Sequence, residues 1–235
     1  MYNLDRKNIL WQAHDKGLHD GFINFWMGMI EDVIDKVTPD TTLIEFGSIN
    51  SNFLRFIHLA FPYRKATGVL LDVDKIESKI EWPVPSDTQV SFINESNISS
   101  SVPRHDIGFS QEIFSLLPDL EGHAHVMWNL LETDGVYYTS FGWHSDNPSS
   151  SLQKKLRASK GQPYYSYSLD EVAETFHRVG FEVGFKRLRL PYYMIYEPQM
   201  VSSRYGNVNQ MISCIQDHKV LFSFRKWGTS NEGRK

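Results

Sequence analysis

The sequence has a single cysteine, no long apolar run and no excess of basic charge. One cysteine, Cys214, excludes an intrachain disulfide framework and a cysteine-based zinc site, and such a residue is usually a small part of the core. No apolar run approaches the roughly 20 residues that span a bilayer. Charged residues recur throughout the N-terminal segment, unlike a secretory signal. These absences predict a soluble, cytoplasmic protein with no membrane partner and no metal ion.

The charge balance and the apolar content argue against two further classes of protein. The net charge is −4 and the pI is about 6.1, which argues against a nucleic-acid partner bound through a basic face. Hydrophobic residues make up 41% of the chain and aromatic residues 14%, enough to form a core rather than a disordered chain. A length of 235 residues suits one large α/β domain.

Strand and helix patterns alternate along most of the chain. An amphipathic helical pattern over residues 22–37 stops before Pro39. The alternation after it predicts an α/β fold, in which a mostly parallel sheet carries helices on both faces. Strands are predicted at 43–44, 67–71, 89–93, 105–110, 136–141, 181–190 and 219–227, and helices at 53–61, 113–117, 123–131 and 168–178.

Local signals mark several ends of these elements. Glu171 stands three residues after Ser168, which is a capping box, and Gly180 is a C-cap glycine. Residues 142–167 are a polar connection with tyrosines near its end, and residues 191–217 are an aromatic segment that contains a helix. We predict one domain over 1–235, divided into an N-terminal helical cap (1–38), a core (39–190), an insertion (191–217) and a final strand (218–227).

Three strings in the second half of the chain, taken in order, resemble one family. HDIGFSQEIFSLLPD at 105–119 is similar to that family's fourth strand and following loop. HVMWNLLETDGVYYTS at 125–140 and YSLDEVAETFHRVGFEV at 167–183 resemble two of its later patterns. The family is the class I S-adenosylmethionine-dependent methyltransferases, and the resemblance covers roughly residues 40–190. It implies a Rossmann-like sheet of seven strands with an antiparallel last strand, and S-adenosyl-L-methionine as the cofactor.

The stretch TTLIEFGSINSNF at 41–53 reads as a strand, a tight turn and a helix start. In an open α/β sheet a nucleotide-like ligand binds beyond the carboxyl end of such a strand. The resemblance makes Glu45 and Gly47 the first acid and first glycine of the family's cofactor turn, with Ser48 beside them; glycine lets the backbone approach the ligand. Ile49 and Ser51 replace the second and third glycines. Because a β-branched residue tolerates positive φ badly, they imply a differently shaped turn.

Other cofactor contacts are implied by the same resemblance. Asp72, at the end of the second strand, would accept hydrogen bonds from both ribose hydroxyls, with Asp74 as the alternative. Its spacing from Gly47 is close to the ~20 residues usual for a ribose-binding acid in related nucleotide folds. The loop after the third strand would meet the adenine, and the residues after the fourth strand would line the sulfonium and methyl side. The residues implied are Asn97 and Ile98 for the adenine, and Ser110 and Gln111 for the methyl side.

The segments expected to cover the cofactor are rich in aromatic residues. This composition predicts a small or amphipathic organic acceptor in a closable pocket, methylated on oxygen or nitrogen. His144 directly follows the fifth strand and is the first candidate for a general base, because histidine titrates near neutral pH. His14 and His19 are the next candidates. The plainer interpretation of each is a surface histidine or a hydrogen-bonded core histidine.

Two other functions stay open at this point. A catalytically inactive member of the fold would serve as a binding or scaffold protein, and the altered glycine turn favours it. An NAD-dependent or nucleotide-sugar enzyme is the other, and the absence of G-x-G-x-x-G counts against it. The aromatic residues of 191–217 would either cover a substrate or form a homodimer contact.

Overall fold

Seven strands form one open sheet in the computed structural model, which describes residues 20–31, 33, 36–48, 52–71, 90–98, 102–188, 194 and 196–228. The strands are β1 (Thr42–Phe46), β2 (Lys65–Leu70), β3 (Val90–Asn94), β4 (His105–Gln111), β5 (Leu131–Phe141), β6 (Glu182–Arg187) and β7 (Val220–Arg225). Their order is β3-β2-β1-β4-β5-β7-β6. β1 to β5 are parallel, and β7 is antiparallel to both β5 and β6. The predicted α/β fold is confirmed.

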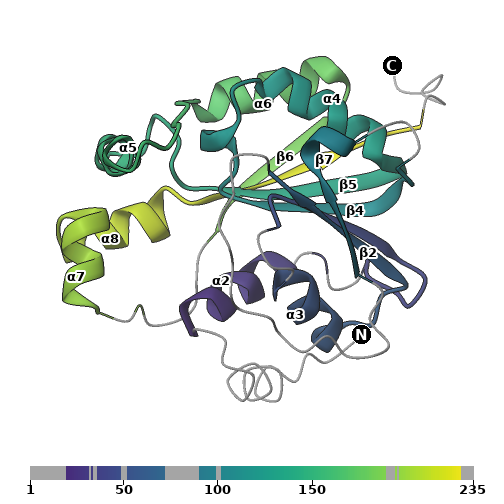
Figure 1. Cartoon of the computed structure of the whole chain (residues 1–235), viewed down its shortest axis with the longest axis horizontal. Helices are drawn as coiled ribbons and strands as arrows, with labels where there is room; N and C mark the ends of the chain where they lie inside the picture. The colour runs from purple at the N-terminus through teal and green to yellow at the C-terminus, as the bar shows by residue number, and fades with distance from the viewer. Residues whose placement is uncertain are drawn as a thin grey trace.

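Helices cover both faces of this sheet (Figure 1). α2 (Asp20–Ile30) and α3 (Asn52–Ala60) lie under one face, and α4 (Leu120–Leu130) and α6 (Leu169–Val179) lie over the other. α5 (Ser150–Ser159), α7 (Pro198–Met200) and α8 (Val208–Ile212) lie together at one end of the sheet. The remaining turns are the 3₁₀-helices η1 (Glu95–Asn97) and η2 (Phe114–Leu116) and the π-helices η3 (Val201–Tyr205) and η4 (Ser213–Asp217). No described helix is long and apolar enough to cross a membrane.

Side chains that alternate along the strands build a hydrophobic layer on each face. Phe109 of β4 packs with Phe53 of α3, and the two rings meet edge to face at 5.1 Å. On the opposite face Tyr137 of β5 packs with Phe176 of α6, which stacks on Phe224 of β7 at 3.8 Å. Aromatic pairs of this kind contribute about 0.5–1.5 kcal/mol each beyond the burial of their surface. The sheet is therefore held rigidly between its helices.

The predicted signals at the ends of α6 are confirmed. The Ser168 hydroxyl accepts the Glu171 N–H at 3.1 Å, and the Glu171 carboxylate accepts the Ser168 N–H at 2.6 Å. Gly180 ends the helix with a φ of 116°, in the left-handed region that favours glycine. Cys214 is buried and free, as the sequence predicted.

Some element boundaries differ from the prediction. The first helix was expected over 22–37 but ends at Ile30, and turns follow it in the described residues. The fifth strand begins at Leu131 instead of residue 136, because the expected Asp134 turn lies inside the strand, where φ of Asp134 is 64° and the register against β4 shifts. The connection at 142–167 contains α5, which has no buried residue. The division into cap, core, insertion and final strand stays a prediction.

Candidate functional site

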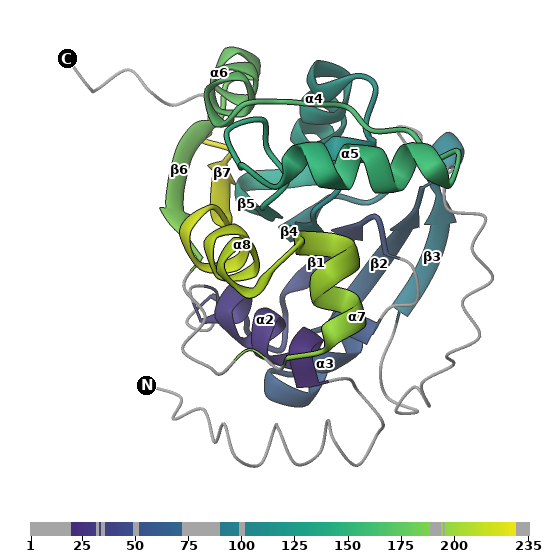
Figure 2. The same ribbon diagram turned by 90° about the vertical axis from the view of Figure 1, so that its left-hand side faces the viewer.

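The order of the sheet reverses between β1 and β4, which neighbour one another although β2 and β3 follow β1 in the chain. In an open α/β sheet such a switch point opens a crevice beyond the carboxyl ends of the strands, and ligands bind there. Figure 2 looks onto this end of the sheet and shows α5, α7, α8 and α2 arranged around the ends of β1 and β4. The predicted cofactor residues of the β1 turn and of the end of β4 lie at the carboxyl ends of these two strands.

The turn after β1 is tight and needs glycine. Gly47 has a φ of 80°, and the N–H groups of Gly47 and Ser48 both donate to the carbonyl of Val69, each at 2.9 Å. A Cβ on Gly47 would stand 2.6 Å from Cγ2 of Ile113. The left-handed backbone and this close approach both exclude a larger residue. The turn is therefore packed closely against Ile113, and its role as a cofactor cradle stays a prediction.

A chain of hydrogen bonds connects this turn to β4 and α2. Glu45 of β1 is buried, and its carboxylate accepts the Ser48 hydroxyl at 2.7 Å and the Gln111 amide at 3.2 Å. The side-chain oxygen of Gln111 accepts the Trp26 indole N–H at 2.7 Å. Burial raises the pKa of Glu45 to about 7, although both hydrogen bonds act against the rise. Glu45, Ser48 and Gln111 are therefore brought together, around an acid that titrates near neutral pH.

Ser110 was expected to line the methyl side, but its side chain lies in the core. Its hydroxyl is 2.5 Å from the Tyr137 hydroxyl and 2.6 Å from the Thr139 hydroxyl. The Tyr137 hydroxyl is also 3.0 Å from Nε2 of His123. The period of two along β4 turns Ser110 toward the α4–α6 layer. Gln111, one residue later, directs its side chain to the opposite face, where it contacts Glu45 and Trp26.

The residues predicted to contact the adenine lie at the end of β3. Asn97 is the exposed last residue of η1, and the N–H of Ile98 donates to the Glu95 carbonyl at 3.1 Å. Ile98 is half-buried against the α4–α6 layer. The other predicted site residues lie outside the described residues: Asp72, His14 and His19.

His144, the first candidate base, is anchored inside the protein. It is buried, and its Nε2 donates to the carbonyl of His218 at 2.7 Å. Its Nδ1 lies 3.5 Å from the carboxylate of Asp146, which is exposed. These contacts fasten the segment after β5 to the end of η4. A ring held in this way positions the segment, and its role as a general base stays a prediction.

An ion pair that sequence reasoning missed stands beside Gln111. The Glu112 carboxylate accepts the Gly142 N–H at 2.7 Å and lies 3.1 Å from the Lys219 ammonium. The ammonium also lies 4.3 Å from the ring centre of Phe25 in α2. The only sequence signal was an acid directly after the fourth predicted strand. Nothing in the sequence pointed to Lys219, which the fold brings in from the other side of the insertion.

The segments after β5 and before β7 build a small cover with its own core. Trp143 stacks on Tyr205 at 5.9 Å, and the Tyr164 hydroxyl donates to the Trp143 carbonyl at 2.8 Å. The Asn147 amide donates to the Gly142 carbonyl and to the sulfur of Cys214. Burial raises the pKa of the Cys214 thiol to about 11, so the thiol is unreactive at neutral pH. The cover therefore supplies aromatic surface, as predicted, but no nucleophile.

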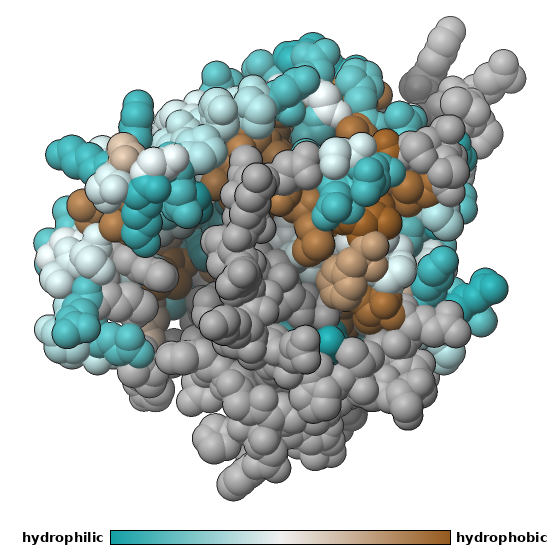
Figure 3. Space-filling view, in the orientation of Figure 1, coloured by the Kyte–Doolittle hydropathy of each residue, from teal (hydrophilic) through white to brown (hydrophobic). Residues whose placement is uncertain are grey.

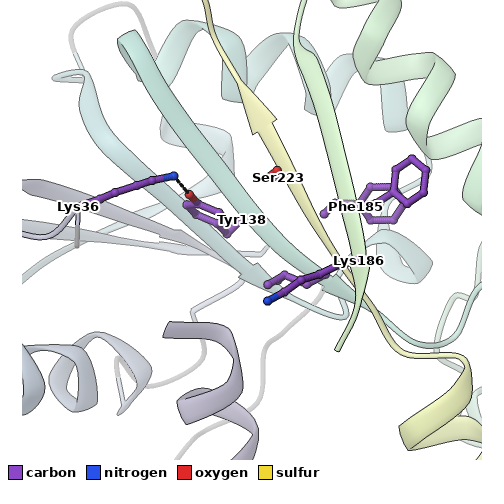
Figure 4. A pocket seen from close by; sticks show the side chains of 7 residues that line it. Lys36, Tyr138, Phe185, Lys186 and Ser223 are labelled. Atoms are coloured by element: carbon purple, nitrogen blue, oxygen red, sulfur yellow. Dashed lines mark hydrogen bonds between the residues drawn. The ribbon is translucent and has the colours of Figure 1, made fainter. Parts of the chain in front are cut away.

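A hollow on the sheet lies apart from this crevice. It is lined by residues of β5, β6 and β7 and by Lys36, which donates to the Tyr138 hydroxyl at 2.5 Å (Figure 4). In the space-filling view, hydrophobic residues gather below the layer of α4 and α6 (Figure 3). None of the predicted site residues that the structure describes lines the hollow.

Among the described residues, no group of three His, Cys, Asp or Glu side chains is placed to hold a metal ion.

The fold is similar to those of solved methyltransferases. No protein-family model matches the chain, and no curated protein matches its sequence. The methyltransferase in the Haloferax volcanii complex with the Trm112 methyltransferase activator has a TM-score of 0.68 at 13% identity, covering 97% of this chain and 100% of its own. The S-adenosylmethionine-dependent methyltransferase from Mesorhizobium loti scores 0.61 at 12% identity, covering 86% and 98%.

A third structure contains both a substrate and a cofactor product. The geranyl diphosphate C-methyltransferase from Streptomyces coelicolor, in complex with Mg²⁺, geranyl diphosphate and S-adenosyl-L-homocysteine, has a TM-score of 0.58 at 14% identity. The match covers 94% of this chain and 83% of that one. At such identities the similarity establishes the fold, which agrees with the strand order and the antiparallel β7.

Proposed function

We propose that this chain, which has the class I methyltransferase fold, is an S-adenosylmethionine-dependent methyltransferase that acts on oxygen or nitrogen of a small organic acceptor. The observation that carries the proposal is the arrangement at the β1–β4 switch point, where the tight Gly47 turn and the buried Glu45 carboxylate stand together. A fold alone does not define a function. The proposal therefore rests on whether these residues suit the cofactor.

The residues at the crevice suit the methionine end of the cofactor. A cationic ammonium near Glu45 would compensate the burial that holds its pKa near 7. Gly47 and Ser48 would bring backbone to the same end, and Gln111 would face the methyl side. Asn97 and Ile98 would contact the adenine. Asp72 is proposed for the ribose hydroxyls.

Catalysis of methyl transfer depends mainly on positioning the acceptor against the methyl group of the cofactor. When bound, the cofactor supplies an electrophilic methyl group on a positively charged sulfur. The chain's part is to align an acceptor with that methyl, and alignment alone is worth effective molarities of ~10⁵–10⁸ M. The cover around Trp143 and Tyr205 would exclude water. The acceptor proton would pass to solvent or to a base, for which His144, His14 and His19 stay candidates.

Calorimetric titration tests the proposal directly. We expect S-adenosylmethionine and S-adenosylhomocysteine to bind with measurable heat and to raise the melting temperature. Asp72→Ala should weaken binding by the loss of hydrogen bonds to a charged group, ~1.5–3 kcal/mol each. Absence of both heat and thermal shift at millimolar ligand would contradict the proposal. Unchanged affinity in Asp72→Ala would move the ribose contact to another residue.

A catalytically inactive binding protein is the alternative, and the sequence at the turn favours it. Ile49 and Ser51 stand where the family has glycines. The Haloferax neighbour is in complex with an activator protein, so a member of this fold can bind a protein partner. Cofactor binding with no methyl transfer to any of a broad set of small acceptors would favour this alternative. Cytoplasmic localisation and a homodimer stay predictions.

A further inference from the structure

The residue after β4 has an unusual backbone. Glu112 has a φ of 57°, and Asp134 is the only other non-glycine residue with positive φ in the described part of the chain. Such a conformation persists only where its surroundings hold it, and it clusters at ligand sites. The Glu112 N–H donates to the Ser140 carbonyl at 3.0 Å, and its carboxylate reaches back to the Gly142 N–H. The strained backbone thus aims a carboxylate across the ends of β4 and β5.

Lys219 approaches this carboxylate from the start of β7. Its ammonium lies 3.1 Å from Glu112, and the two side chains are 16% and 22% exposed. The pair is therefore sheltered: the Glu112 oxygen that faces Lys219 is buried, while the rest of both side chains is partly exposed. A Cβ on Gly142 would stand 3.0 Å from Cε of Lys219 and 3.3 Å from the Glu112 carboxylate. Glycine at this position makes the room in which the pair sits.

The surroundings of the pair are aromatic. The Lys219 ammonium lies over the Phe25 ring, and Trp143, next to Gly142, stacks on Tyr205 of the cover. Glu112 directly follows Gln111, whose side chain reaches the Gly47 turn through Glu45. The pair thus stands on the β4–β5 side of the switch point, while the cradle stands on the β1 side. A ligand that spans both would place its acceptor atom near Glu112 and Lys219.

We propose that the Glu112–Lys219 pair recognises a carboxylate on the methyl acceptor, so that the substrates are small aromatic or amphipathic acids. This inference rests on the proposed function. An ammonium has three donors, and a substrate carboxylate would take the place that Glu112 holds in the free protein. Lys219 and the sulfonium are both cationic, so they attract an anionic acceptor and repel a protonated amine. Phe25 and the cover would receive the apolar part of the molecule.

The test compares matched acids and amides. Protein loaded with S-adenosylhomocysteine is titrated with a panel of aromatic carboxylic acids and their neutral carboxamides. We expect the best acid to bind ~10-fold or more tightly than its amide, the value of one charge-assisted hydrogen bond. Lys219→Gln should remove this preference and Lys219→Arg should keep it. Glu112→Gln should bind acids more tightly than the wild type, because the competing carboxylate is gone.

Controls separate this inference from the proposed function. Lys154→Gln, on the exposed face of α5, should leave the preference unchanged. Equal binding of acids and amides, no binding of either at millimolar concentration, or a preference that survives Lys219→Gln would overturn the inference. If Lys219→Gln does not fold, the Glu112→Gln variant tests the inference: tighter binding of acids supports it, and unchanged or weaker binding overturns it. If S-adenosylhomocysteine itself fails to bind, the proposed function fails; the same titration of the free protein then still tests the acid site.

Discussion

At the residue scale, the burial of Glu45 should lower the stability of the fold at neutral pH, while its negative charge should favour cofactor binding. Burial raises its pKa from 4.5 to about 7, so the folded chain holds this proton more tightly than the unfolded chain. The unfolding free energy should therefore fall as pH rises from about 4.5 through about 7. Glu45→Gln removes this loss, and we expect it to be more stable than the wild type by ~3 kcal/mol near pH 8 but not near pH 5. Urea unfolding at both pH values measures the difference.

A surface acid provides the control for that experiment. Glu174→Gln, at an exposed position of α6, should change stability equally at both pH values. If the wild type and Glu45→Gln show the same pH dependence, Glu45 is not the buried acid that the geometry indicates.

The same acid predicts how cofactor binding depends on pH. S-adenosylmethionine is cationic, and an ionised Glu45 attracts it more strongly than a protonated one. With a pKa near 7, ionisation rises from about a tenth near pH 6 to about nine tenths near pH 8, so Kd should fall by up to ~10-fold over this range. Glu45→Gln should bind more weakly, with a flat profile. A wild-type profile that is equally flat, measured by calorimetry, would place the cofactor's ammonium away from Glu45.

Gly47 and Gly161 form a matched pair for the turn after β1. Both have positive φ, 80° and 66°, but a Cβ would meet Ile113 at 2.6 Å in the first case and nothing within 4 Å in the second. Gly161→Ala should cost only the backbone strain of a left-handed alanine, ~1–2 kcal/mol. Gly47→Ala should cost more and should also lose cofactor binding. Denaturation and titration of both variants check this, and equal costs would show that Ile113 yields without penalty.

At the element scale, the strands and most helices could be predicted because their signals are local. Apolar runs and the caps of α6 are each contained within a few neighbouring residues. α5 was missed because its many polar and charged residues indicated a polar connection, and its two leucines are only half-buried. The first helix was drawn too long, since Val33 and Val37 are buried beside it and continue the apolar spacing without continuing the helix.

The capping box at the start of α6 should contribute measurably to the free energy of unfolding. Ser168→Ala removes a hydroxyl that accepts the Glu171 N–H and should cost ~1 kcal/mol of unfolding free energy. Ser149 is the matched control, because it stands at the N-cap of α5 without a side-chain capping bond. Ser149→Ala should therefore cost less in the same urea titration. An equal cost for both would show that the capping box contributes little beyond the loss of a serine.

At the scale of the whole molecule, the site could be predicted only in part because it is assembled from distant segments. Glu45, Gly47 and Gln111 could be predicted to lie near one another, since a resemblance in order along the chain places them at the ends of β1 and β4. Glu112 and Lys219 meet because β7 pairs with β5 in the antiparallel direction. This pairing joins distant parts of the chain and leaves no local signal in the sequence. Ser110 was assigned correctly to the strand but to the wrong face of the sheet.

The connection of all seven strands in one sheet predicts a single unfolding transition. The cover has its own small core, but the hydrogen bond from the Gly142 N–H to Glu112 links it to the end of β4, so it should melt with the sheet. S-adenosylhomocysteine at 100-fold excess over Kd should add about 2.7 kcal/mol, which raises the melting temperature by ~5–10 °C for a domain of this size. Homocysteine, which lacks the nucleoside, should give a far smaller shift in the same calorimetric scan. Two separate transitions, only one of them moved by the ligand, would divide the chain into more than one domain.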